Sequence, residues 1–266
     1  MSKWQIDLIG KKPTIKNPIL IEGLPGIGNV GKIAADFLVD ELKAKKIYDI
    51  FSYSFPHSVF VGENNLVELP AISIYHKQLK NKMDLLILNG DIQPTDEEAC
   101  YEFCDKVLDI INEFGCKNIV TLGGIGLHAE PKEPKVYCTG NNKKAVDNIK
   151  SNCSLNEKLF GVVGPIIGVS GVLLGLAKKR NIDAVALLAE TSAHPMHIGI
   201  KGAKAIIETL NKKYSLGMDM KDLNKEVEMI EKDSLKKSDQ FGQVSKRSAL
   251  KKLTSRIGKE PVDYIG

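Results

Sequence analysis

The feature that most constrains the fold of this chain is a run of 19 uncharged residues, 159–177, followed directly by three cations at 178–180. A run of this length is long enough to cross a bilayer as one helix. Gly164 and Pro165 interrupt the run near its start, however, and a Gly-Pro pair breaks a continuous helix. We therefore expect no membrane span but three consecutive buried elements: a short strand at 160–163, a helix at 169–180 and a strand at 182–189.

Apolar strands and amphipathic helices also alternate upstream of this run. Strands that are apolar throughout indicate a parallel sheet covered by helices on both faces. The pattern therefore predicts an α/β fold, a three-layer sandwich with a mostly parallel central sheet. The hairpin-like segment 50–75 predicts additional antiparallel edge strands. The expected strands are 19–21, 48–55, 59–61, 66–75, 84–88, 119–122 and 136–139, and the expected helices are 30–43, 95–114 and 200–214.

The predicted helix 95–114 carries two local signals. Thr95, followed three residues later by Glu98, has the pattern of a capping box and predicts where the helix begins. Cys100 and Cys104 are four residues apart, which places both thiols on one side of a helix. The chain has five cysteines, no C-x-x-C pair and no evident further zinc ligands. Together with a start that lacks a secretory h-region, this predicts reduced thiols in a cytoplasmic protein.

The composition changes after residue 215, which divides the chain into three predicted parts. Residues 1–215 form the α/β domain, residues 216–237 an amphipathic helix whose narrow apolar stripe is typical of packing on a partner helix or subunit, and residues 238–266 a basic flexible tail. The net charge is only +4, which does not by itself indicate a nucleic-acid-binding protein. Nucleic-acid binding through the basic stretch 236–259 is an alternative that the acidic residues before it disfavour.

A glycine-rich loop follows the first buried strand. Gly26, Gly28 and Gly31 form G-x-G-x-x-G between a strand and a helix, which is the context of a dinucleotide site. The acid expected about 20 residues later is matched only by Asp49, at the wrong end of its strand. The segment also resembles a P-loop, but Ile33 stands where a metal-binding Ser or Thr is needed. We therefore expect structural glycines in a tight turn, with anion binding at the helix N-terminus as the alternative.

A second glycine-rich stretch begins with Gly123 and Gly124, after the predicted strand 119–122. His128 and Glu130 follow it in the arrangement of a general base and the carboxylate that orients it. However, no serine or cysteine lies in the strand–turn–helix elbow that a nucleophile needs. We therefore expect a tight structural loop with a surface histidine rather than a catalytic site.

Glu190, His194 and His197 suggest a metal site after the predicted strand 182–189. Two histidines three residues apart, together with a carboxylate, are suitable zinc ligands. Pro195 lies between the histidines and opposes the regular helix that such ligand pairs usually need. We therefore expect a shaped loop, no bound metal and no cofactor.

Three sequence blocks together carry a family resemblance. They are EGLPGIGNVGKIAADFLV at 22–39, GGIGLHAEPKEPKVYCT at 123–139 and GPIIGVSGVLLGLAKKRNIDAVALLAETSAHP at 164–195. In this order they resemble the archaeal branch of the proteasome assembly chaperone two family. The resemblance implies a nucleoside-phosphorylase-like α/β fold, a homo-oligomer, and a non-enzymatic role in binding the α subunits of the proteasome core particle. It also implies that the glycine loop is structural and holds no cofactor.

The resemblance further implies a binding role for the C-terminus. Members of this family can insert a tail that ends in a hydrophobic residue, a tyrosine and any final residue into pockets between α subunits. A free carboxylate and a tyrosine ring suit such a pocket. This chain ends with Tyr264, Ile265 and Gly266, so its tyrosine is one place early, and Asp263 stands where the hydrophobic residue belongs. We take Tyr264, Ile265 and Gly266 as the candidate partner-binding residues.

One competing interpretation concerns the glycine-rich crevices. In that reading the chain is a nucleoside-phosphorylase-like enzyme or small-molecule-binding protein that uses the loops at Gly26–Gly31, His128 and His194. The two interpretations place the functional residues differently. The first places them at the surface of the α/β domain and in the C-terminal tail, and the second in crevices of that domain.

Overall fold

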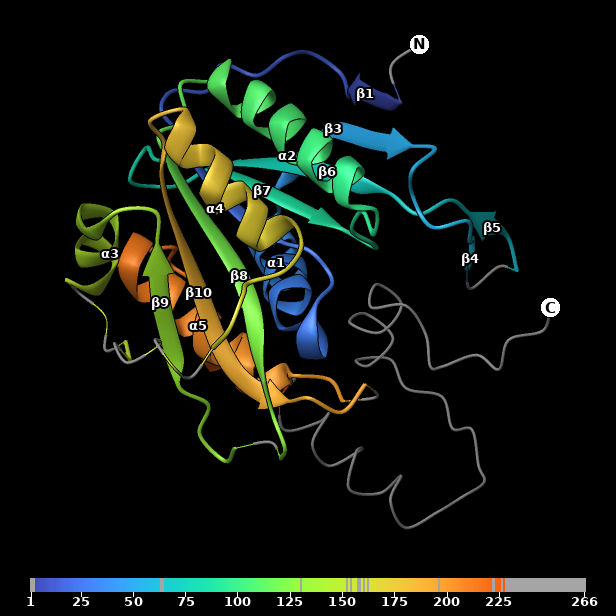
Figure 1. Cartoon of the computed structure of the whole chain (residues 1–266). Helices are drawn as coiled ribbons and strands as arrows, with labels where there is room; N and C mark the ends of the chain where they lie inside the picture. The colour runs from blue at the N-terminus through green and yellow to red at the C-terminus, as the bar shows by residue number, and fades with distance from the viewer. Residues whose placement is uncertain are drawn as a thin grey trace.

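The computed structural model describes residues 3–62, 65–129, 131–151, 153, 155–156, 159, 161, 163–195, 197–221, 223–225 and 227. These residues form three layers, with helices on both faces of a central sheet (Figure 1). This confirms the predicted α/β sandwich. One face is covered by α1 (Val30–Glu41), α3 (Lys143–Lys150) and α5 (Ile200–Tyr214), and the other by α2 (Glu97–Asn112) and α4 (Val169–Lys179).

The central sheet has eight strands among the described residues, in the order β1-β3-β6-β7-β2-β8-β10-β9. Their bounds are β1 (Trp4–Leu8), β2 (Ile19–Gly23), β3 (Lys45–Ser52), β6 (Ile72–Gln78), β7 (Asp84–Gly90), β8 (Asn118–Leu127), β9 (Val136–Gly140) and β10 (Asp183–Ser192). The four middle strands, β7, β2, β8 and β10, are parallel to one another. The outer strands join by antiparallel pairing, with β6, β3 and β1 on one side and β9 on the other. The predicted parallel core and antiparallel edge are therefore confirmed.

Two hydrophobic cores lie on the two faces of the sheet. Side chains alternate between faces along a strand, so Leu20 of β2 lies in the core under α2 and α4 while Ile21 lies in the core under α1 and α5. All seven residues of β7 are buried, because helices cover both faces of this strand. The carboxyl ends of the parallel strands lie at one edge of the sheet, where the glycine loop leaves β2 to enter α1.

A short ribbon extends from the antiparallel side of the molecule. It consists of β4 (Phe60–Val61) and β5 (Val67–Glu68), which pair with each other and form a separate two-stranded sheet. Figure 1 shows the ribbon beyond the ends of β3 and β6. The sequence predicts strands in this region, but the first is shorter than expected, and the segment 66–75 is divided between β5 and β6.

Two local expectations need correction. The strand predicted at 119–122 continues to Leu127, so Gly123 and Gly124 lie inside β8 and not in a loop after it. Here β8 stays paired with β10 along its whole length, which holds the glycines in strand conformation. Helix α2 begins after Asp96 rather than Thr95, because the Asp96 carboxylate accepts a hydrogen bond from the backbone N–H of Ala99 (2.8 Å).

Parts of the predicted C-terminal organisation lie outside the described residues. This is the case for the whole predicted tail, 238–266, and for much of the segment 216–237. The apolar stripe predicted in this segment consists of Met220, Leu223, Val227 and Ile230. Of these, Leu223 and Val227 are buried in the core under α1 and α5 of the same chain. The predicted strand 160–163 is described only at residues 161 and 163. Where the chain is described, its helices are too short or too polar to cross a membrane.

Candidate functional site

The glycine loop after β2 packs against neighbouring backbone. A Cβ atom on Gly31, in the first turn of α1, would collide with the backbone carbonyl oxygen of Leu122 in β8. Similarly, a Cβ on Gly124 would collide with the carbonyl oxygen of Ile27 in the short 3₁₀ helix η1 (Ile27–Asn29). Gly28 has a φ of +59° in this turn, a conformation that favours glycine. The loop is therefore packed directly onto β8.

This packing shows which glycines the fold needs. A Cβ on Gly28 would lie 2.8 Å from the hydroxyl oxygen of Thr191, and a Cβ on Gly123 would lie 3.0 Å from a methyl carbon of Leu188. Gly26 differs, because its backbone is extended and an added Cβ would meet nothing within 4 Å. Of the three glycines that mimic a dinucleotide fingerprint, Gly28 packs against the Thr191 side chain and Gly31 against the Leu122 backbone. Gly26 has no such steric requirement among the described residues.

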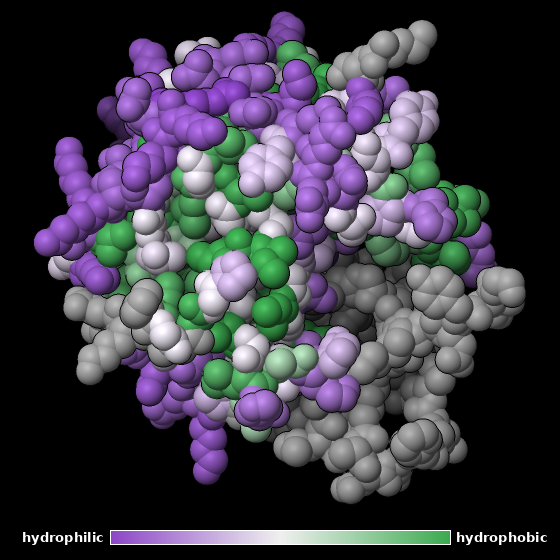
Figure 2. Space-filling model, viewed as in Figure 1, coloured by the Kyte–Doolittle hydropathy of each residue, from purple (hydrophilic) through white to green (hydrophobic). Residues whose placement is uncertain are grey.

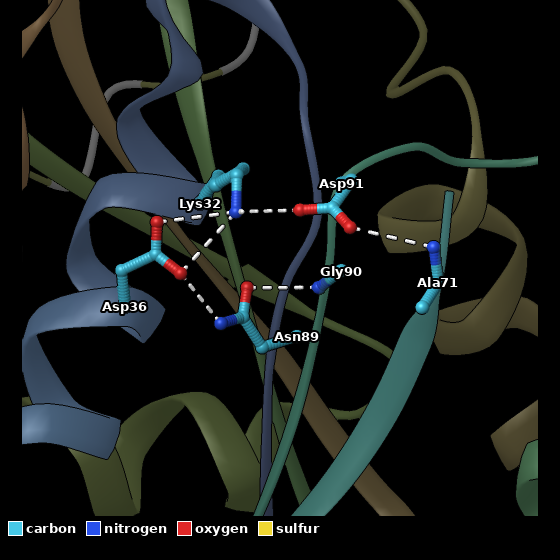
Figure 3. Close-up of polar contacts among 6 residues, drawn as sticks. All are labelled: Lys32, Asp36, Ala71, Asn89, Gly90 and Asp91. Atoms are coloured by element: carbon cyan, nitrogen blue, oxygen red, sulfur yellow. Dashed lines mark hydrogen bonds and ion pairs between the residues drawn. The ribbon is translucent and has the colours of Figure 1, made fainter. Parts of the chain in front are cut away.

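A polar cluster lies beside this loop, between α1 and the carboxyl end of β7 (Figure 3). The Lys32 ammonium is 3.2 Å from Asp36 Oδ1 and 3.1 Å from Asp36 Oδ2, one helical turn along α1. The Asn89 side chain donates a 2.6 Å hydrogen bond to Asp36 Oδ1 and accepts one from the backbone N–H of Gly90 (2.8 Å). Asp91 lies 3.8 Å from the Lys32 ammonium. We call Lys32, Asp36, Asn89 and Asp91 the polar cluster.

The polar cluster forms the inner wall of a cavity of about 380 Å³. The side chains of Lys32 and Asp36 are only 4% and 5% exposed, so their charges are largely removed from water. The cavity also exposes Asp40, Lys43 and Lys46, which gives its wall equal numbers of lysines and aspartates. The cluster groups are directed at one another, and a buried charge that is paired and hydrogen-bonded is tolerated in a fold. This geometry fixes α1 against the end of β7.

A second buried carboxylate lies on the opposite face of the sheet. Glu22 of β2 is completely buried; its carboxylate accepts hydrogen bonds from the Ser170 hydroxyl in α4 (2.9 Å) and from the Leu24 backbone N–H (3.1 Å). Burial raises the pKa of Glu22 from its ordinary 4.5 to about 7, against the opposing effect of these two bonds. Glu22 therefore links the carboxyl end of β2 to the first turn of α4.

The histidines predicted as catalytic or metal-binding residues are not assembled into such a site where the structure is described. His128 is exposed just after β8, and Glu130 lies outside the described residues. Glu190 accepts hydrogen bonds from the Tyr137 hydroxyl (2.9 Å) and from the Lys135 backbone N–H (3.0 Å). Within the described ranges, His, Cys, Asp and Glu form no group of three that suits a metal ion. The metal interpretation of Glu190, His194 and His197 thus has no support in this geometry.

The cysteines are free thiols, as expected from the sequence. Cys100, Cys104, Cys116 and Cys138 are buried, and Cys153 is half-buried. Burial raises the pKa values of Cys116 and Cys138 to about 11, so these thiols stay protonated at neutral pH. They act as small apolar residues of the core.

Two apolar regions remain exposed on the surface. The first is the outer face of α4 and the residues before it, where Ile167 is 83% exposed. The second is the β4–β5 ribbon, where Leu66, Val67 and Leu69 are each more than 60% exposed. Figure 2 shows apolar side chains gathered over α4, with charged side chains over α2 above them. Exposed apolar patches of this kind mark interaction sites more often than isolated apolar residues do.

Comparison with known proteins identifies the family of this chain. The model of the family described as the PAC2 family matches residues 20–236. The chain belongs to the PAC2 family. This confirms the resemblance that the three sequence blocks predict. Among curated relatives, the uncharacterized protein MJ1210 of Methanocaldococcus jannaschii is 30% identical over 253 residues, which cover 95% of this chain and 93% of that protein.

Two solved structures extend the comparison of this PAC2-family chain. Pyrococcus furiosus PbaB, an archaeal proteasome activator, is 33% identical with a TM-score of 0.79, and the match covers 90% of this chain and 100% of PbaB. Pyrococcus furiosus PbaA, an archaeal homolog of proteasome-assembly chaperone, is 27% identical with a TM-score of 0.69, covering 88% of this chain and 92% of PbaA. The fold is thus that of the PAC2 family, and the likeness to nucleoside phosphorylases stays a prediction.

Sequence reasoning missed the polar cluster of this PAC2-family chain. One signal was present, because Lys32 and Asp36 are charged residues four apart among the otherwise apolar residues 30–39. Their partner Asn89 is 53 residues from Asp36 in sequence, and no local pattern connects them. The candidate tail residues Tyr264, Ile265 and Gly266 lie outside the described residues.

Proposed function

We propose that this chain is a non-enzymatic chaperone or adaptor of the proteasome, which assembles as a homo-oligomer and binds α subunits of the core particle. The observation that carries the proposal is the likeness to PbaB, an archaeal proteasome activator, at 33% identity over 90% of this chain and all of PbaB. PbaA, a homolog of proteasome-assembly chaperone, supports the same class of partner. The sequence identities of both matches, 33% and 27%, indicate relatedness beyond a shared fold.

The geometry of the glycine loop supports a function without chemistry in the crevices. A dinucleotide or phosphate site needs open space at the start of the helix, where backbone N–H groups point at the ligand. In this chain Gly31 and Gly124 pack against the backbone of Leu122 and Ile27. This packing explains these two glycines without a bound ligand, as the proposed binding function requires.

The C-terminal arm is the proposed contact with the α subunits. Tyr264 offers an apolar ring with a hydroxyl, and the carboxylate of Gly266 offers a negative charge for a pocket lysine. One short tail binds weakly on its own. Several tails on one oligomer raise the overall affinity by roughly 10²–10⁴ when they reach adjacent pockets. Oligomerisation and the tail therefore act together in this proposal.

The test is capture of purified archaeal core particles and of free α subunits by the immobilised full-length chain. We expect capture of α subunits by the full-length chain, and at least a tenfold loss of affinity when residues 260–266 are deleted. The substitution Tyr264→Ala separates the ring from the length of the arm, and Lys259→Ala is the matched control outside the last residues. Unchanged capture after the deletion overturns the role of the tail only, whereas absence of any capture overturns the proposed function.

A further inference from the structure

The outer face of α4 combines apolar character with exposure. Val172 and Leu176 lie half-buried one helical turn apart, and Ile167 before the helix is 83% exposed. These residues belong to the uncharged run 159–177, so the centre of the face carries no charged side chain. A surface of this composition resembles the apolar centre of a permanent interface between subunits, which is poorer in charge than a transient one.

Gly175 is a second feature of this face that the isolated chain does not explain. It lies exposed inside α4, where glycine is less favourable than alanine by about 1 kcal/mol. A Cβ built on Gly175 meets nothing within 4 Å. Gly171, one turn earlier, is different, because a Cβ there would collide with the carbonyl oxygen of Ile166. Among the described residues nothing sterically requires a glycine at position 175, but a glycine on a helix face lets another backbone approach closely.

Charges at the two ends of this region have opposite sign. Lys178 and Lys179 are exposed at the end of α4, and Glu97 and Glu98 are exposed in the first turn of α2. The two helices lie side by side and run in the same direction (Figure 1). Their starts are joined through Gln93, just before α2, whose side-chain oxygen accepts the backbone N–H of Val169 (3.1 Å). Acidic and basic groups therefore lie at opposite ends of one surface.

The far ends of the two helices are also fixed to each other. The Arg180 guanidinium, at the end of α4, donates hydrogen bonds to Asp105 (2.7 Å) and Asp109 (2.6 Å) in the second half of α2. Asp105 and Asp109, the acidic residues of α2 near Lys178 and Lys179, are thus paired with Arg180. The acidic start of α2 and the basic end of α4 are left to face outward, at a separation set by the length of α4.

We propose that the α4 face is the contact between two copies of this chain, packed antiparallel across a two-fold axis with Gly175 at the close approach. Such an axis brings Lys178 and Lys179 of each copy near Glu97 and Glu98 of the other, whereas parallel packing brings like charges together. The contact uses the same surface on both copies, as a two-fold interface requires. The inference rests on the proposed function, because it names the contact through which the proposed homo-oligomer forms.

The first test is the mass of the full-length chain in solution, measured by sedimentation over a dilution series. Gly175→Gln places a longer polar side chain at the contact while favouring the helix of the single chain. We expect it to raise the dissociation constant of the oligomer at least tenfold without lowering the thermal midpoint of the separated chains. Lys144→Gln, at an exposed site in α3, is the matched control and leaves the dissociation constant unchanged.

The second test is charge reversal with rescue. The pair Lys178→Glu and Lys179→Glu weakens the oligomer, and so does the pair Glu97→Lys and Glu98→Lys. The chain that carries all four substitutions regains assembly, because each end again meets its opposite charge. An oligomer unchanged by Gly175→Gln and by both reversals overturns the inference but leaves the proposed function standing if capture of α subunits persists. A wild-type chain that is monomeric at all concentrations overturns the inference and the oligomeric part of the proposal.

Discussion

Removing one partner of the buried Lys32–Asp36 pair tests how the polar cluster holds α1 in place. In Asp36→Ala, the Lys32 ammonium stays in a site where its side chain is 4% exposed, with Asp91 at 3.8 Å as its remaining acid within the polar cluster. The Asn89 amide also loses its 2.6 Å acceptor. Breaking a buried pair in this way costs about 3–5 kcal/mol, and an unsatisfied donor adds about 1 kcal/mol or more. For a domain of this size, about 4 kcal/mol corresponds to a fall of roughly 8–16 °C in the thermal midpoint.

The double variant Lys32→Met with Asp36→Leu distinguishes a lost pair from lost packing. It removes both charges and keeps apolar volume, so we expect it to be much less destabilised than Asp36→Ala, within about 1–2 kcal/mol of the wild type. The measurement is equilibrium unfolding in urea at pH 7, followed by circular dichroism. The single variants Lys32→Met and Asp36→Leu complete a double-mutant cycle. If Asp36→Ala costs less than about 1 kcal/mol, or if the double variant is as unstable as Asp36→Ala, the reasoning about the buried pair is refuted.

Three further predictions concern the loop, the buried carboxylate and the crevices. Gly31→Ala is expected to cost about 1–3 kcal/mol in urea unfolding, because its methyl group meets the Leu122 backbone, whereas Gly26→Ala, with open space around it, is close to neutral; equal costs contradict this. The pKa of Glu22 is raised from 4.5 to about 7 in the folded chain. The protonated Glu22 therefore contributes to the free energy of unfolding fully below pH 4.5, and this contribution is lost as the pH rises to about 7. In Glu22→Gln this pH-dependent loss of stability, about 3 kcal/mol in all, is expected to disappear. If the wild type and Glu22→Gln lose stability equally between pH 4.5 and 7, the raised pKa of Glu22 is contradicted. Nucleotides, nucleosides and inorganic phosphate are expected to leave the thermal midpoint unchanged, and a concentration-dependent rise reveals a binding crevice.

The parts of the fold that local pattern determines were predictable from the sequence. The predicted helix at 200–214 matches α5, and the helix at 169–180 matches α4 to within one residue, because apolar residues recur there at helical spacing. The strand at 84–88 also belongs to β7, whose continuous apolar run indicates burial on both faces.

Features that depend on contacts between distant segments were not predictable in the same way. Gly123 and Gly124 suggest a turn, because glycine is unfavourable in strands; their place inside β8 depends on pairing with β10 and on the approach of Ile27. Helix α2 is capped by Asp96 because its side chain reaches the N–H of Ala99, a choice between neighbouring cap residues that spacing alone does not settle.

In the candidate site, too, features set by local sequence were predictable and contacts between distant segments were not. The sequence indicated structural glycines before α1, and the collision expected at Gly31 gives the physical reason for one of them. It gave no indication that Asn89 meets Asp36, because the two residues are 53 positions apart in sequence, with β3, β4, β5 and β6 between α1 and β7. A resemblance carried by three sequence blocks located the family, whereas the proposed contact surface on α4 was inferred from exposure in the folded chain.

The most direct measurement of the central claim is a native mass determination of the full-length chain, alone and mixed with archaeal proteasome α subunits. The account predicts a complex that contains several copies of this chain together with α subunits, and a mass that reverts to separate components when residues 260–266 are removed. A mixture in which the chain and the α subunits keep their individual masses at all concentrations contradicts the account.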